Sequence, residues 1–367
     1  MVAVPVTGTF ADRVARLHRD VERLGLSVSD MRRADPLELQ MVGLSDSSQV
    51  GRLVDIERLE TTPIEARMVP TLPTSASRIR AFLDGSQRSF LVWRCGLVPV
   101  AATVAAAAVL VRDPAGRCEV APGTLRLAHA LFIPRRSSEP RVNDLVERVL
   151  ATGMTVIDPL DHLVDEAEYA AALGDYGRMV EFAYRAARNV REQLESDLLR
   201  GWTGTPRRTA DDGWIVVDGR LRVAAPRAIG LVKQFTDRHL AGTEAETLLN
   251  LAPGHRTTAF CPSDNFRGLG ADRPVDDEAG ATDRTLWYLR LWDAAGLDAR
   301  HALIRIEAGP DLRDSDRIDE LSAWLMAERT PRATADARWA TLLYPVHYLE
   351  RILKRRLEAD TRGWPAG

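Results

Sequence analysis

The sequence predicts an α/β protein in which a mixed sheet is flanked by helices. Short apolar runs of the kind that form strands begin near Arg80, and a long amphipathic helical pattern covers residues 166–200. Two further strand patterns, at 213–221 and 227–233, follow that helix. This order predicts the class, because a sheet whose strands alternate with helices is covered by those helices on its faces.

Length and composition agree with a folded protein. The chain has 367 residues, 45% of them hydrophobic, which is enough for a substantial core. Its 49 Lys and Arg residues against 52 Asp and Glu give a net charge of −3, unlike a small, strongly basic nucleic-acid binder. The three cysteines, Cys95, Cys118 and Cys261, lack CxxC spacing, which argues against a disulfide framework or a cysteine zinc site.

The N-terminal region is expected to form an appended helical segment over residues 1–75, followed by the main domain over residues 76–360. Residues 10–24 carry an apolar stripe with steps of four and three, typical of a helix: Phe10, Val14, Leu17, Val21 and Leu24. Such a stripe either packs on its own domain, the commoner arrangement, or contacts a partner or a second copy of the chain.

The next region is rich in strand patterns. The run "RAFLDGS" (80–86) predicts a strand that ends in a turn at Asp84, and "RDPAGRC" (112–118) predicts a hairpin turn. The uncharged run 96–111 has 16 residues and contains a proline. Because a membrane helix needs about 20 residues, we expect a buried strand there.

The remaining elements follow in order along the chain. They are an irregular stretch (134–165), a helix (166–200), strands at 213–221 and 227–233, a hairpin (285–309), and helices at 315–328 and 345–357. At the N-terminus, Asp12, Arg13 and Arg16 interrupt what would be the apolar part of a signal peptide. We therefore expect a cytoplasmic protein without a membrane partner.

Two strand patterns run into Asp-Gly, at Asp84 and at Asp218. If the strands are neighbours, the two carboxylates repel each other unless a cation lies between them. Carboxylates suit Mn²⁺ or Mg²⁺, and two such ions about 3.5–4 Å apart are the usual machinery of phosphodiester cleavage. The alternative is that Asp-Gly is simply a common turn dipeptide.

The helix between these strands offers a third carboxylate. On a helical wheel of about 100° per residue, Glu195 lies nearer the apolar face than Glu192, which points almost the opposite way. Glu195 is therefore the expected ligand and Glu192 its alternative. Asp197 projects from the middle of that face as a further candidate, and ordinary surface glutamates remain possible for the first two.

The last constellation is "LLYPVHYLERILKRR" (342–356). Pro345 fits the first helical turn, which places Tyr344 near the cap and His347 in that turn. His347 could bind a metal as a neutral imidazole or act as an acid toward a leaving oxygen, or it is simply packed. Arg351 and Arg355 continue the stripe and would contact a phosphate backbone, although solvated helix ends are also commonly basic.

Several enzyme classes are excluded by missing motifs. Only two of the basic residues are lysines, Lys233 and Lys354, and neither follows a glycine, so no phosphate-binding GxxxxGK[ST] loop is present. The GxSxG motif of serine hydrolases and the HExxH motif of zinc proteases are also missing.

Taken together, these motifs resemble the NurA nucleases, whose core resembles the RNase H and Piwi fold. The resemblance covers about residues 80–356 and rests on four features in order: "FLDGS", a helical glutamate, "IVVDGRL" followed by "AIGLVK", and a "YP" helix that carries a histidine. It implies an RNase H-like mixed sheet flanked by helices. It also implies a Mn²⁺-dependent, or Mg²⁺-dependent, nuclease that acts on DNA ends and single strands.

The resemblance also assigns roles to residues. It implies Asp84 and Asp218 as metal-binding aspartates, Glu195 or Glu192 as the helical acid, and Lys233 as the lysine after the next strand. Tyr344 and His347 would complete the site, although the family's histidine generally lies further from its tyrosine, which leaves a packed His347 open. Ser86 would hydrogen-bond a phosphate or a metal-bound water, with Lys233, Arg351 and Arg355 also on the substrate.

The resemblance further implies partners. A HerA-type hexameric ATPase would drive movement along DNA in end processing and double-strand break repair, and the nuclease would form a homodimer. A catalytically silent RNase H-like scaffold that binds DNA or a motor is the alternative. A metal-dependent phosphatase for small substrates is another, and it would lack salt-dependent DNA binding.

Overall fold

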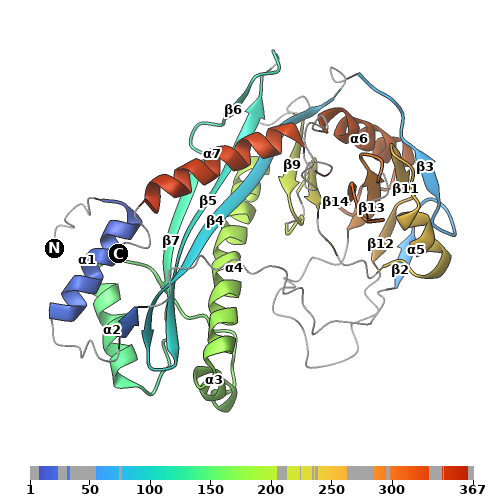
Figure 1. Ribbon diagram of the computed structural model, residues 1–367. Helices are drawn as coiled ribbons and strands as arrows, with labels where there is room; N and C mark the ends of the chain where they lie inside the picture. Colours follow the sequence, from blue (N-terminus) through green and yellow to red (C-terminus); the bar gives the residue numbers. More distant parts are fainter. Residues whose placement is uncertain are drawn as a thin grey trace.

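The chain forms an α/β structure in which helices flank one large mixed sheet, which confirms the predicted fold class (Figure 1). The computed structural model describes residues 8–23, 31–33, 55–73, 77–113, 115–204, 213–223, 225–233, 235, 239–262, 284–294, 298–329, 341 and 343–362. The helices are α1 (Phe10–Arg23), α2 (Pro140–Ala151), α3 (Glu166–Leu173), α4 (Tyr176–Thr203), α5 (Gly242–Leu249), α6 (Ser315–Glu328) and α7 (Tyr344–Asp360).

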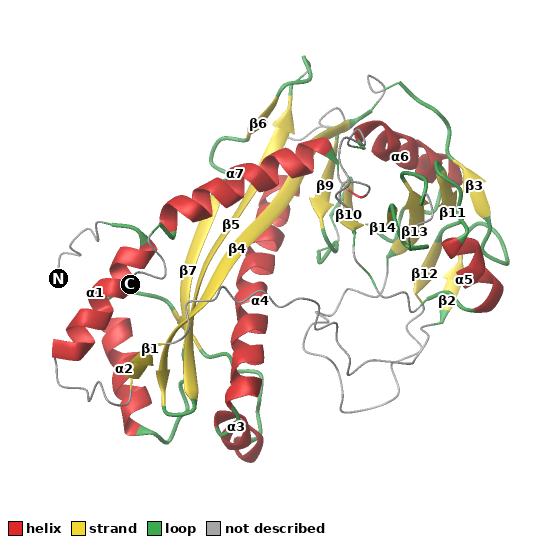
Figure 2. Ribbon diagram, in the orientation of Figure 1, coloured by secondary structure: helices red, strands yellow, loops and turns green. Residues whose placement is uncertain are grey.

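The strands that the structure describes join into one sheet (Figure 2). They are β1 (Met31–Arg33), β2 (Ile56–Arg58), β3 (Ala66–Met68), β4 (Ile79–Cys95), β5 (Val98–Arg112), β6 (Cys118–Val120), β7 (Arg126–Phe132), β8 (Val156–Ile157), β9 (Trp214–Asp218), β10 (Ala228–Val232), β11 (His255–Thr257), β12 (Phe260–Pro262), β13 (Thr285–Arg290) and β14 (Leu303–Ala308). The main path is β2-β12-β13-β14-β10-β9-β4-β5-β7-β8, with β4, β9 and β10 mutually parallel.

A long antiparallel hairpin, β4 with β5, forms the centre of the sheet. The buried strand predicted over 96–111 is confirmed by β5. The predicted turn at Asp84 is wrong, because Asp84 and Gly85 lie inside β4 and pair with Ala108 and Ala107. The unbroken, alanine-rich β5 pairs with β4 through this point, so an Asp-Gly pair does not end the strand.

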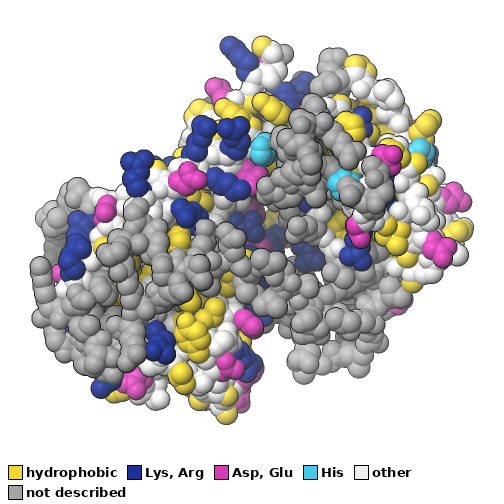
Figure 3. All heavy atoms as spheres, viewed as in Figure 1, with side chains coloured by type: hydrophobic (Ala, Val, Ile, Leu, Met, Phe, Trp, Pro, Cys, Tyr) yellow, Lys and Arg dark blue, Asp and Glu magenta, His cyan; other side chains and the backbone are white. Residues whose placement is uncertain are grey.

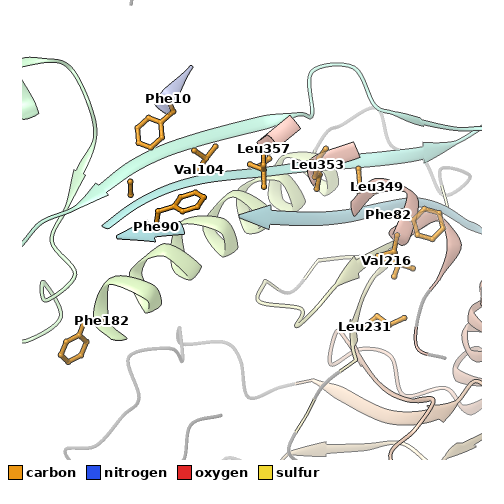
Figure 4. Packing of buried hydrophobic residues seen from close by; sticks show 14 of the residues in the cluster. Phe10, Phe82, Phe90, Val104, Phe182, Val216, Leu231, Leu349, Leu353 and Leu357 are labelled. Atoms are coloured by element: carbon orange, nitrogen blue, oxygen red, sulfur yellow. The ribbon is translucent and has the colours of Figure 1, made fainter. Parts of the chain in front are cut away.

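Two helices cover opposite faces of this hairpin and of β9. Phe82 and Val216 belong to the same buried cluster as Leu349 and Leu353 of α7 (Figure 4). The alternate residues Leu83 and Val217 pack instead with Leu198 and Leu199 of α4. Because successive side chains of a strand point to opposite faces, the sheet has an α7 face, on the side of Phe82, and an α4 face, on the side of Leu83.

Most of the other predicted elements are confirmed. The expected helix over 166–200 is two helices, because α3 stops before Gly174 and Asp175 caps α4 by accepting a hydrogen bond from the Arg178 amide at 3.0 Å. The irregular stretch expected over 134–165 is wrong in part, since it contains α2. Pro140 is the first residue of that helix, where proline is favoured. In the described part of the chain, no helix combines the length and the apolar character of a membrane span.

Residues 1–75 contain more than a helix in their described parts. The side chains of Phe10, Val14 and Leu17 in α1 are buried, and Phe10 stacks on His129 of β7 with ring centroids 4.7 Å apart. These three residues of the stripe therefore pack on their own chain, while the side chain of Val21 and all of Leu24 lie outside what the structure describes. Strands β1, β2 and β3 pair with β4, β12 and β11, so this region contributes to the sheet.

A buried charge network holds the far end of the sheet together. The guanidinium of Arg256 in β11 is fully buried and donates to Glu60, at 2.7 Å, and to Asp319 of α6, at 2.5 Å. Burial alone would raise the pKa of Glu60, but hydrogen bonds from Arg256 and Ser315 lower it to about 2. The network thus joins the segment before β3 to β11 and α6.

Candidate metal centre

The fold brings Asp84 and Asp218 side by side. Leu83 of β4 pairs with Val217 of β9 in parallel register, and the two aspartates follow directly. Neighbouring strands lie about 4.8 Å apart. By the alternation of side chains, both aspartates point to the α7 face, like Phe82 and Val216.

Asp84 is the most constrained of the acids. It is only 4% exposed, and its Oδ1 accepts a hydrogen bond from the Gly85 amide at 2.8 Å, whereas Oδ2 is buried without a hydrogen-bond partner among the described residues. Burial raises the pKa of Asp84 well above its usual range, and the negative charges of Asp218, Glu195 and Glu350 raise it further. The positive charge of Lys233 opposes this rise only in part.

Lys233, predicted to bind substrate, is the ion-pair partner of Asp218. Leu231 of β10 pairs with Asp218, and Lys233, two residues on, points to the same face. Its Nζ lies 2.8 Å from Asp218 Oδ2. The lysine therefore balances one of the two adjacent aspartates.

Glu195 approaches the same point from the α4 face. An added Cβ on Gly85 would lie 2.1 Å from Glu195 Oε1 and 2.9 Å from its Cδ, so only a glycine leaves room for this carboxylate. Arg191, one helical turn earlier, donates to Glu195 Oε1 at 2.5 Å. Burial nevertheless raises the pKa of Glu195 to about 7, with contributions from the charges of Glu192 and Asp218.

The helical-wheel prediction for the other two acids of α4 is wrong. Glu192 is buried like Glu195 and pairs with Arg222 at 2.7 Å, while Asp197 is exposed and pairs with Arg200 at 2.9 Å. The reason is that α4 has 28 residues and crosses a twisted sheet, so its buried side changes along its length. Ala183 packs on β5 and β7, whereas Leu198 packs on β4 and β9.

Glu350 of α7 belongs to this group and was not among the predicted residues. Its charge acts on Asp84, and its carboxylate contacts Lys354 at 2.6 Å and His347 at 3.6 Å. Burial would raise the pKa of Glu350, but the hydrogen bond and charge of Lys354 and the charges of Lys233 and His347 lower it. The sequence offered one sign that Glu350 faces the sheet, since it follows the buried Val346 by four residues, about one helical turn. The basic residues around it drew attention away from this carboxylate.

The remaining predicted residues lie around the group of acids formed by Asp84, Asp218, Glu195 and Glu350. Tyr344 is 60% exposed at the start of α7, and no hydrogen bond or ion pair between described residues links it to the aspartates. His347 approaches the group through Glu350. Arg351 and Arg355 are exposed on α7, where Figure 3 shows gathered Lys and Arg side chains, and Ser86 is half-buried in β4.

The chemistry of these donors fits a hard divalent cation. Carboxylate oxygens are the preferred ligands of Mg²⁺ and Mn²⁺, and the unpartnered, buried Asp84 Oδ2 offers such an oxygen. Within the described residues, no three acidic, histidine or cysteine side chains converge on one cation position. The reason lies in the ion pairs, because Arg191 holds Glu195 and Lys233 holds Asp218.

The raised pKa of Glu195 predicts a pH-dependent stability of the metal-free protein. Folding favours the protonated carboxyl, so this contribution is fully present below the ordinary pKa of 4.5 and is lost as the pH rises toward about 7. The stability of wild type relative to Glu195→Gln should fall by on the order of 3 kcal/mol over that range. Urea unfolding in EDTA at several pH values measures it, and a difference that stays constant with pH contradicts it.

Comparison with models of known protein families finds none that matches this chain, and comparison with curated proteins finds no similar sequence.

Proposed function

We propose that this chain is a metal-dependent deoxyribonuclease, a phosphodiester hydrolase that uses Mn²⁺ or Mg²⁺. One observation carries the proposal: the buried Asp84 has a carboxylate oxygen without a partner among the described residues and lies beside Asp218, with Glu195 and Glu350 adding negative charge. Like charges gathered in this way are costly without a cation. A divalent ion is the partner that relieves this repulsion and supplies phosphodiester chemistry.

The residues then divide into three groups by role. Asp84 and Asp218, with Glu195 or Glu350, would hold the ion, which when bound polarises a phosphate oxygen and lowers the pKa of a bound water. Lys233 and the exposed Arg351 and Arg355 carry positive charge next to these acids, which suits a phosphate backbone. A histidine beside Glu350, His347, is placed to exchange a proton near the same acids.

The proposal also includes three properties implied by the resemblance to NurA nucleases: an RNase H-like core, a motor partner and a homodimer. An RNase H-like core is compatible with the observed path β7-β5-β4-β9-β10, in which the connection from β7 to β9 contains α2, β8, α3 and α4, and β9 is parallel to β4. Because the sequence has no P-loop, movement along DNA in end processing would come from a separate HerA-type hexameric ATPase. A homodimeric nuclease is part of the same proposal.

The test is cleavage of labelled single-stranded and blunt duplex DNA with Mn²⁺, with Mg²⁺ or with EDTA. Wild type, Asp84→Ala and Asp218→Ala are compared at equal concentration. The proposal predicts metal-dependent cutting by the wild type that both variants lose. A folded wild type that cuts neither substrate, even with a HerA-type ATPase added, contradicts it.

A second candidate is a catalytically silent RNase H-like scaffold for DNA or a motor. The two ion pairs favour it, because Lys233 and Arg191 already occupy Asp218 and Glu195 at 2.8 Å and 2.5 Å. The two candidates differ in metal affinity. The scaffold would bind DNA in EDTA and show no change in melting temperature with Mn²⁺.

A further inference from the structure

A second group of charges lies on the α4 face, close to the end of β9. In β14, Arg305 and Glu307 alternate with Ile304 and Ile306, which belong to the core on the opposite face. Glu307 is buried and receives hydrogen bonds from Arg305 at 2.7 Å and from Arg284 at 2.9 Å. These contacts place two arginines against a single carboxylate.

The loop after Asp218 is held directly above this carboxylate. The Leu221 amide donates to Glu307 Oε2 at 3.0 Å. An added Cβ on Gly230 would lie 2.6 Å from Leu221 N and 2.8 Å from Gly219 O, so the loop rests on the bare backbone of β10. Arg220 lies between these two anchored residues, and its position relative to Asp218 is therefore fixed.

Arginines outnumber carboxylates on this side of the sheet. We call the six residues Arg188, Arg191, Arg220, Arg222, Arg284 and Arg305 the arginine cluster. Their nearby acids are Glu192, Glu195 and Glu307, which pair with Arg188, Arg191, Arg222, Arg284 and Arg305. Six guanidinium groups against three carboxylates leave an excess of positive charge beside the acidic group.

Arg220 is the residue of the arginine cluster whose charge is exposed to solvent and has no paired carboxylate among the described residues. Its side chain is exposed, and among the described residues it makes no hydrogen bond or ion pair. Partial loss of solvation lowers the pKa of Arg220, the charge of Glu307 opposes this, and the charges of Arg305, Arg222 and Arg284 lower the pKa further. Next to it, the side chain of Arg305 is 5% exposed, and its buried Nε has no hydrogen-bond partner in the part of the chain that the structure describes.

We propose that the arginine cluster is a phosphate-binding subsite, centred on Arg220, for the backbone of a nucleic-acid strand. The planar guanidinium matches two phosphate oxygens at once. Only Gly219 lies between Asp218 and Arg220, so their Cα atoms are at most about 7 Å apart, which is about two steps of a duplex strand at roughly 3.4 Å each along the helix axis. The subsite would thus hold a phosphate close to the one at the aspartates, and this assignment rests on the proposed function.

The test measures binding without cleavage. A fluorescently labelled oligo(dT) is titrated with wild type, Arg220→Gln, Arg220→Lys and the control Arg141→Gln in EDTA at several salt concentrations. Arg141 is exposed on α2, far from β9 in Figure 1. Arg220→Gln should weaken binding roughly tenfold and lower the slope of log K against log salt by about 0.7.

Arg220→Lys and the control sharpen the result. Arg220→Lys keeps the charge, so it should restore the salt slope and only part of the affinity, since an ammonium lacks the planar fork. Arg141→Gln should match the wild type in both quantities. An Arg220→Gln protein that binds with wild-type affinity and slope overturns the subsite, and so does a wild type that binds no oligo(dT).

Failure of the subsite and failure of the nuclease proposal are distinguishable. If the wild type cuts no DNA but its binding to oligo(dT) depends on Arg220, the subsite stands and the nuclease proposal falls. If the wild type cuts DNA while Arg220→Gln binds like wild type, the nuclease proposal stands without the subsite. Melting temperatures in EDTA verify that the variants are folded.

Discussion

The Asp84→Asn variant is expected to lose metal-dependent DNA cleavage and, in EDTA at pH 8, to melt at a higher temperature than the wild type. Asparagine keeps the shape of the side chain but removes a buried charge that lies near Asp218, Glu195 and Glu350. Cleavage should fall at least about 100-fold, since even residues that only support a metal ligand cost 10–100-fold. The melting temperature should rise by about 2–4 °C for each kcal/mol of repulsion removed.

The opposite signs of these two effects make the prediction specific. A residue that only packs the core would lose stability when replaced, and activity would fall with it. The matched control is Asp197→Asn, because Asp197 is exposed on α4 and pairs with Arg200. Asp197→Asn should leave cleavage and melting temperature close to wild type. If the Asp84→Asn protein still cuts DNA, Asp84 is not a metal ligand.

The Gly85→Ala variant is expected to lose most of its cleavage with only a modest change in stability. The added methyl group would lie 2.1 Å from Glu195 Oε1, so the carboxylate must leave its position on the α4 face. The atom displaced is the end of a side chain, which limits the cost to about 1–3 kcal/mol. Cleavage should fall by at least about tenfold if Glu195 supports the metal.

The control for this substitution is Gly201→Ala. Gly201 lies in α4, and an added Cβ there would meet no atom within 4 Å. Alanine is favoured over glycine inside a helix by about 0.5–1 kcal/mol, so the control should be as stable as wild type or more stable, with unchanged cleavage. If the Gly85→Ala protein cuts DNA at the wild-type rate, cleavage does not depend on the position of the Glu195 carboxylate next to Gly85.

The proximity of Asp84 and Asp218 could be predicted from the sequence, because the end of an apolar run marks a definite position along a strand. Each aspartate follows an apolar run, and parallel neighbours bring the ends of such runs to the same level. The turn predicted at Asp84 is wrong, since β4 continues past this residue. Gly85 is needed there because it lets the Glu195 carboxylate come close to the strand. Local dipeptide preference cannot reveal that β5 provides a partner strand through this point.

The surroundings of the aspartates depend on tertiary contacts and could not be predicted in the same way. Glu192 is buried because the loop after β9 brings Arg222 onto it, which no helical wheel of α4 contains. Glu350 joins the group because α7 crosses β4 at that point. Lys233 was predicted to bind substrate, which stays a prediction, and its contact with Asp218 follows from the pairing of β9 with β10.

The central claim is that the acids around Asp84 bind a divalent cation, and calorimetric titration of Mn²⁺ into the metal-free protein tests it most directly. At pH 6, below the pKa of about 7 of Glu195, wild type should bind Mn²⁺ with release of protons, because metal ligands must be deprotonated and burial raises the pKa values of Glu195 and Asp84. Asp84→Asn should abolish this binding while Asp197→Asn retains it. No heat of Mn²⁺ binding to the wild type, or equal binding to Asp84→Asn, would contradict the account.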